Sequence, residues 1–182
     1  MRGMAHMLDR LSAGLNRVAL AGAVLAVLVM LFAAGWQVIA RYLLDAAPVW
    51  TEEAARRAMV WAGMLGASAA FRAGADPVLF PAMLHVRGRI GTVLALIRAA
   101  GVAVFAIPVL WFSAFGPNMD PARGFMGRSL ERTAEMLQVP MIWFTIAVPI
   151  AFTLILIHML AALACHLSGA APLRDTAQKE TP

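Results

Sequence analysis

Two glutamates and two arginines form the densest group of charged side chains in the sequence. Glu52 and Glu53 are followed four positions later by Arg56 and Arg57. Residues four positions apart lie on the same face of a helix, and glutamate before arginine is the favourable order for an ion pair. The spacing therefore predicts two ion pairs. Because each carboxylate already has a basic partner, we do not expect this group to act in acid–base catalysis.

The histidines and the single cysteine form no recognisable metal or redox motif. His6, His85, His158 and His166 are too scattered for a metal signature, and Cys165 alone can form neither an internal disulfide nor a cysteine cluster. Haem ligation by two histidines would need them on facing helices, whereas His158 and His166 share one segment and differ by about 80° around its axis. We therefore expect no catalytic, cofactor-binding or metal-ligating residues. A membrane anchor for a redox enzyme remains an alternative.

The composition is that of a membrane protein. Of the 182 residues, 62% are hydrophobic and 14% are charged, whereas about 25% would be charged in a soluble domain. A single soluble core of this size could not bury so much apolar surface. The apolar runs are far longer than the strands of a membrane barrel, so the spans must be helices. The composition excludes a soluble enzyme and a disordered chain, and it predicts an all-α integral membrane protein.

Four segments could cross a bilayer as helices. The stretch from Val18 to Ala40 contains no charge and is long enough to span the hydrocarbon core. The run from Ala58 to Phe71 is too short by itself, so its helix must begin earlier, with Thr51 as the expected N-cap. Pro149 is expected to bend the last span. We predict four transmembrane helices at about 18–41, 50–71, 98–116 and 140–167.

The remaining segments are expected to lie at the membrane surface or in solvent. Apolar residues recur on one helical face in 4–18 and in 90–97, a pattern typical of interfacial amphipathic helices. Charged residues in 117–139 indicate a loop with a short amphipathic turn. We expect residues 1–171 to form one membrane domain and residues 172–182 to form a polar cytoplasmic tail.

The distribution of lysine and arginine predicts the orientation. Four spans place both termini and the 72–98 connection on one side of the membrane. That side then carries nine basic residues, and the other side carries six. Cytoplasmic segments are enriched in such residues, so we expect both termini to be cytoplasmic. The nine lie at positions 2, 10, 17, 72, 87, 89, 98, 174 and 179, and the six at 41, 56, 57, 123, 128 and 132.

The polar group at the start of the second span has two interpretations. It could be an aromatic belt with snorkelling arginines and surface ion pairs, or it could be a surface that binds a partner protein. Small residues further along, in Gly63-x-x-x-Ala67 and Gly66-x-x-x-Ala70, would let another helix approach closely. The candidate partner interface comprises Arg41, Trp50, Glu52, Glu53, Arg56, Arg57, Trp61, Gly63 and Gly66.

The run from Gln37 to Gly74 resembles the small membrane subunit of tripartite ATP-independent periplasmic (TRAP) transporters. In that family, Arg-Tyr ends the first span and Trp-x-Glu-Glu followed by Arg opens the second. The chain departs from the family pattern at Asp76, where histidine is common, and at Ala151, where glycine is common. The matching positions are Arg41, Tyr42, Trp50, Glu52, Glu53, Arg56, Trp61, Leu65 and Gly66, with Pro140, Trp143 and Pro149 in the fourth span.

The resemblance implies a non-catalytic subunit in a bacterial inner membrane. Such a subunit pairs with a large permease subunit, which holds the substrate and sodium sites, and with a periplasmic substrate-binding protein. Together they take up organic acids such as C4-dicarboxylates, coupled to sodium. The expected contacts are these two proteins and the lipid bilayer, with no nucleic acid. A free-standing small membrane protein is a further alternative to the redox anchor.

Overall fold

The computed structural model describes residues 2–46, 48–75 and 88–169. No β-strand occurs in these ranges, where the only extended pairing is an isolated bridge between Thr133 and Pro140. The predicted all-α class is therefore confirmed. The helices are α1 (Arg2–Leu43), α2 (Val49–Ala73), α3 (Gly88–Ala114), η2 (Pro117–Met119), η3 (Pro121–Arg123), α4 (Phe125–Leu130), α5 (Ile142–Thr145) and α6 (Ala147–Ser168).

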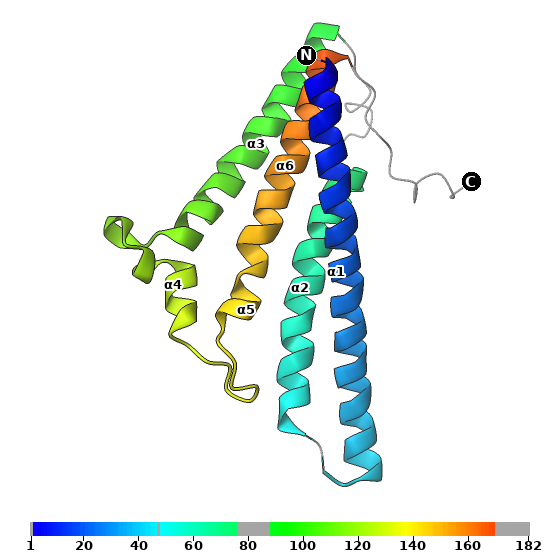
Figure 1. Cartoon of the computed structure of the whole chain (residues 1–182), viewed down its shortest axis with the longest axis vertical. Coiled ribbons are helices and arrows are strands. Elements are labelled where there is room, and N and C mark those ends of the chain that lie inside the picture. The colour runs from blue at the N-terminus through cyan, green and yellow to red at the C-terminus, as the bar shows by residue number, and fades with distance from the viewer. Residues whose placement is uncertain (1, 47, 76–87, 170–182) are drawn as a thin grey trace, which may run out of the picture.

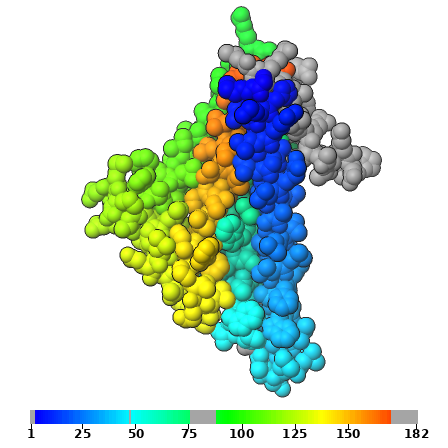
Figure 2. Space-filling view, viewed as in Figure 1, coloured from blue at the N-terminus to red at the C-terminus, as the bar shows by residue number. Residues whose placement is uncertain are grey.

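The four long helices alternate in direction (Figure 1). Helices α1 and α2 form an antiparallel hairpin, α6 packs against both, and α3 packs against α6 while leaning away from it toward α4. The start of α1, the start of α3 and the end of α6 therefore lie at one end of the molecule, here the N-terminal end, and α2 runs toward that end but stops short of it (Figure 1). The turn between α1 and α2 marks the opposite end, here the hairpin end. It extends beyond the segment that joins α4 to α5 (Figure 2).

Among the described residues, three stretches are long and apolar enough to cross a membrane: Gly3–Leu43, Gly88–Ala114 and Ile142–Ser168. Helix α2 has 25 residues, so it is also long enough at about 38 Å. Its polar first turns keep it outside this set. The described part of the chain therefore contains three candidate membrane spans, and the fourth span remains a prediction.

The segments predicted as interfacial helices belong to long helices, as expected for 4–18, which was predicted to run into the first span. Residues 4–18 form the first part of α1, and residues 90–97 lie inside α3. In the first part of α1, Asp9 and Ser12 are buried, whereas Met4 and Leu11 are exposed. The polar face thus contacts the other helices, and the apolar face points outward. The predicted tail at 172–182 lies outside the described residues.

Small residues bring α1 and α2 close together near their middle. Ala19, Ala23 and Leu65 form a buried apolar cluster, with Trp61 packed against it. A Cβ atom at Gly22 would lie 2.8 Å from Cδ1 of Leu65. Gly22 therefore lets the leucine fit against α1, as small residues do between helices in membranes.

Proline determines where the last long helix breaks. The irregular turn falls at Ile146, between α5 and α6, one turn before Pro149, the residue expected to bend this span. Proline has no N–H to donate, and its ring clashes with the carbonyl four residues earlier, here that of Thr145. The helix is therefore interrupted one turn before the proline.

The start of α2 also differs from the prediction. The N-cap is Pro48, and Thr51 lies inside the first turn. The Thr51 hydroxyl donates a 2.7 Å hydrogen bond to the Pro48 carbonyl. The side chain of Thr51, inside the first turn, thus provides a hydrogen-bond donor for the carbonyl of the N-cap residue.

Candidate functional site

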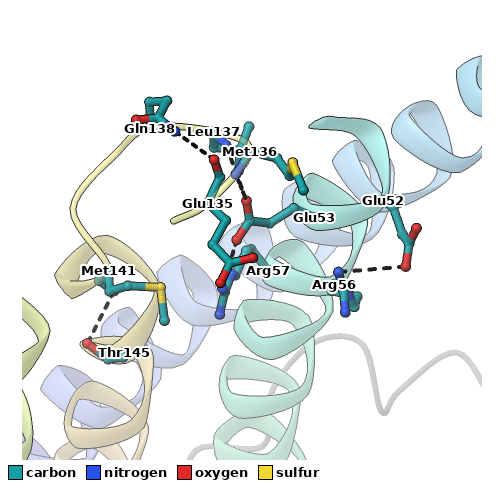
Figure 3. A network of polar contacts seen from close by, with 10 residues as sticks. All are labelled: Glu52, Glu53, Arg56, Arg57, Glu135, Met136, Leu137, Gln138, Met141 and Thr145. Atoms are coloured by element: carbon teal, nitrogen blue, oxygen red, sulfur yellow. Dashed lines mark hydrogen bonds and ion pairs between the residues drawn. The ribbon is translucent and has the colours of Figure 1, made fainter. Parts of the chain in front are cut away.

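The predicted ion pair between Glu53 and Arg57 is present, and it is covered by the chain itself. One carboxylate oxygen of Glu53 accepts a 2.8 Å hydrogen bond from Nη2 of Arg57. The other accepts backbone N–H groups of Met136 at 2.8 Å and Leu137 at 3.2 Å (Figure 3). Glu53 is only 5% exposed. The carboxylate therefore connects α2 to residues 131–141, the segment between α4 and α5, here called the outer segment.

Side chains from the next turns of α2 contact α5. The guanidinium of Arg57 lies 5.4 Å from the centre of the Phe144 ring, within the range of a cation–π contact. The indole N–H of Trp61 donates a 2.9 Å hydrogen bond to the carbonyl of Trp143. Glu53, Arg57 and Trp61 thus form one contact region between α2, the outer segment and α5, here called the outer cluster.

The second predicted ion pair, Glu52–Arg56, is also present but faces outward. Oε1 of Glu52 lies 3.6 Å from Nη2 of Arg56. The two side chains are 65% and 67% exposed. In Figure 3 this pair points away from the outer segment. The two pairs, which look equivalent in the sequence, therefore lie in different environments.

The other residues of the candidate interface lie on the surface. Arg41 and Trp50 are exposed near the α1–α2 turn. A Cβ atom added at Gly63 or Gly66 would meet nothing within 4 Å. These glycines therefore pack against no helix in the described part of the chain. Of the candidate interface residues, the structure thus gathers Glu53, Arg57 and Trp61 in the outer cluster and pairs Glu52 with Arg56 on the surface, and a partner interface remains a prediction.

A second polar cluster, not predicted from the sequence, lies toward the N-terminal end and is here called the inner cluster. Arg72 of α2 donates hydrogen bonds to Asp9, at 3.1 Å, and to Ser12, both of α1. The Ser12 hydroxyl lies 2.7 Å from Nδ1 of His158 in α6. The side chains of Arg72 and Asp9 are 9% and 4% exposed. The inner cluster therefore links α1, α2 and α6 through hydrogen bonds and an ion pair.

One sequence signal could have revealed part of the inner cluster. Asp9, Ser12 and Asn16 are spaced by three and four positions, so they share one face of α1. A polar face beside a membrane span is expected to be covered by protein rather than lipid. The partners Arg72 and His158 are too distant in sequence for any spacing rule.

Cys165 offers a measurement of how tightly α1 and α6 are held. Its thiol is buried, and Sγ lies 3.9 Å from the Ala5 carbonyl. Because it is the only cysteine in the sequence, maleimide labelling reports on this contact alone. We expect little labelling of the native protein and fast labelling after Arg72→Ala, which releases the start of α1. Leu167→Cys in a Cys165→Ser background is the exposed control, and equal labelling of both thiols in the native protein would contradict the packing.

The described residues contain no group of three or more His, Cys, Asp or Glu side chains arranged to hold a metal ion. His158, the histidine considered for haem ligation, directs Nδ1 at Ser12 in the inner cluster. The polar side chains of the outer and inner clusters are thus engaged in contacts between helices.

Comparison with known families identifies the chain. The family model of the DctQ component of tripartite ATP-independent periplasmic transporters matches residues 30–169. The match covers α2, α3 and α6 and both ion pairs of the first turns of α2. No curated protein matches the chain. This family is a component of transporters and not a family of enzymes, and it works with the DctM and DctP components. The chain belongs to the DctQ family, the small subunits of tripartite ATP-independent periplasmic transporters.

Proposed function

We propose that this subunit pairs with a large DctM-type permease subunit in the bacterial inner membrane. With a DctP-type periplasmic binding protein, the complex takes up organic acids such as C4-dicarboxylates, driven by sodium. The subunit provides a scaffold and helps to dock its partners, and it has no substrate site of its own. The observation that carries this proposal is the family match over residues 30–169.

The polar contacts of the chain support a scaffold role. Asp9, Arg72 and His158 are buried in the inner cluster, and Glu53 is buried in the outer cluster. Residues that bind a transported ion must be able to exchange their ligands, whereas these groups hold helices together. The candidate partner interface, from Arg41 to Gly66, belongs to this proposal.

Transport measurements test the proposal. We expect saturable, sodium-dependent uptake of a labelled C4-dicarboxylate by proteoliposomes that contain this subunit, the large subunit and the binding protein. Proteoliposomes with this subunit and the binding protein alone should show no uptake above empty vesicles. Saturable uptake without the large subunit would mean that the chain transports by itself, and the scaffold role would be wrong.

We further propose that residues 1–171 form one domain with four membrane spans and cytoplasmic termini, and that α2 is the fourth span. Two observations support this topology. The four long helices alternate in direction (Figure 1), and basic residues favour the side that holds the termini, by nine to six.

Cysteine accessibility checks this topology. In a Cys165→Ser background, single cysteines at Ala46 and Asn118 should react with a membrane-impermeant maleimide added to intact cells. A cysteine at Ala75 should react only after the membrane is permeabilised. All three positions are exposed in the structure, so burial does not prevent labelling. The reverse pattern would place the termini outside, and labelling of Ala46 and Ala75 from the same side would rule out α2 as a span.

A further inference from the structure

One face of α2 has no partner in the described part of the chain. Glu52, Arg56, Met59, Gly63 and Ala67 are all exposed. They are spaced by three or four positions, so they form one continuous stripe along the helix. This stripe is here called the open face of α2. The opposite face is occupied, since Thr51, Glu53, Ala58, Leu65, Ser68 and Ala69 are buried.

The packing of α2 on α1 places the charged part of the open face beside apolar residues. Leu65 packs at Gly22, and the two helices are antiparallel. Toward the hairpin end, Glu53 lies twelve residues from Leu65 on α2, and Ala34 lies twelve residues from Gly22 on α1. Glu53 and Ala34 therefore lie at about the same level of the helix pair. Ala34 lies within the uncharged stretch of α1, about 10 Å before Arg41. Glu52 and Arg56 therefore lie level with side chains that suit hydrocarbon.

Helices α1 and α3 expose large apolar side chains that suit lipid. On α3, the exposed residues include Val104, Phe105 and Phe112, and on α1 they include Leu25 and Phe32. The open face of α2 instead presents one ion pair, two small residues and a single large apolar side chain. Charged side chains at membrane depth normally face protein or a water-filled cavity. The open face therefore suits a protein partner better than lipid.

We propose that the open face of α2 packs against a transmembrane helix of the large membrane subunit. Gly63 and Ala67 allow a close approach of the two backbones, because nothing lies within 4 Å of a Cβ at Gly63. The Glu52–Arg56 pair meets a polar group of that helix. The face runs about 22 Å along α2, much of it beside the apolar stretch of α1, so the water-soluble binding protein cannot cover it. This inference rests on the proposed function. It adds that the large subunit is the partner that covers the open face of α2.

Photo-crosslinking in the complete complex tests this assignment. The chain is co-expressed with the large subunit and the binding protein, and Met59 is replaced by benzoylphenylalanine. Val104 on α3, which is also exposed, is the matched control. Irradiation should yield a product of this chain with the large subunit from Met59 and none from Val104. A product with a second copy of the chain or with the binding protein, or adducts with lipid only, would overturn the assignment.

A bulky substitution provides a second test. Gly63→Leu should reduce the large subunit co-purified per tagged chain by about tenfold, because an overfilled helix contact cannot close. Gly101→Leu on α3 is the matched control, since Gly101 also has nothing within 4 Å of its Cβ. Equal losses in both variants would overturn the assignment while leaving the proposed function intact. Failure of the wild-type chain to co-purify with the large subunit would instead contradict the proposed function.

Discussion

Replacing Arg72 with alanine is expected to destabilise the helix bundle by about 3–5 kcal/mol, the usual effect of removing one partner of a buried ion pair. Arg72 contacts Asp9 and Ser12 of α1, and Ser12 contacts His158 of α6. Without the guanidinium, the buried Asp9 carboxylate loses the ion pair with Arg72. Thermal unfolding in lipid nanodiscs, followed by the loss of helical circular dichroism, measures the change.

Two further variants distinguish the effect of losing the buried ion pair from the effect of losing any positive charge. Arg89→Ala removes an exposed arginine near the start of α3 and should leave the unfolding temperature nearly unchanged. The double variant Asp9→Leu, Arg72→Met removes both charges and should recover most of the stability, because apolar residues of similar volume can replace a buried pair. An unfolding temperature for Arg72→Ala equal to that of Arg89→Ala would show that the inner cluster does not hold the helices together.

Glu53→Gln is expected to release the outer segment from α2. The substitution keeps the size of the side chain but removes the charge that binds Arg57 and the N–H groups of Met136 and Leu137. Exchange of these two amide hydrogens with solvent deuterium should accelerate by about tenfold or more, since hydrogen bonds to charged groups are among the strongest in proteins. Hydrogen-exchange mass spectrometry of the peptide over residues 131–141 measures this rate.

Glu52→Gln is the matched control because it makes the same chemical change one residue earlier. Glu52 contacts Arg56 on the open face and is exposed. Exchange in the outer segment should therefore stay at the wild-type rate in this variant. Equal acceleration in both variants would mean that the outer segment responds to the net charge of α2 rather than to the contacts of Glu53.

Local chemistry at the ends of α2 made its boundaries predictable. The observed helix, Val49–Ala73, contains the segment 50–71, whose role as a membrane span stays a prediction, and its N-cap is Pro48 rather than the expected Thr51. The helix begins after Pro48 and ends at Gly74, which adopts the left-handed conformation that glycine favours at helix ends. The two ion pairs were predictable for the same reason, since both join residues four positions apart.

Contacts between distant segments were not predictable. Glu53 meets Met136 from 83 positions away, and Ser12 meets His158 from 146 positions away. The start of α1 shows a related difficulty. Its sequence pattern predicts that one face of the helix is polar and the other apolar. It does not reveal whether the polar face meets water or other helices. In this chain it meets α2 and α6.

The distance in sequence between Glu53 and its backbone partners has a consequence for biogenesis. A ribosome synthesises α2 well before residues 136 and 137, whose N–H groups bind the Glu53 carboxylate in the folded chain. If α2 spans the membrane as proposed, it leaves the translocon with this carboxylate paired to Arg57 alone. Its entry into the bilayer then relies on α1, which is already synthesised and supplies the apolar half of the hairpin. In that case we expect the two helices to insert as a pair, with the contacts of Glu53 completed only after the outer segment has been synthesised.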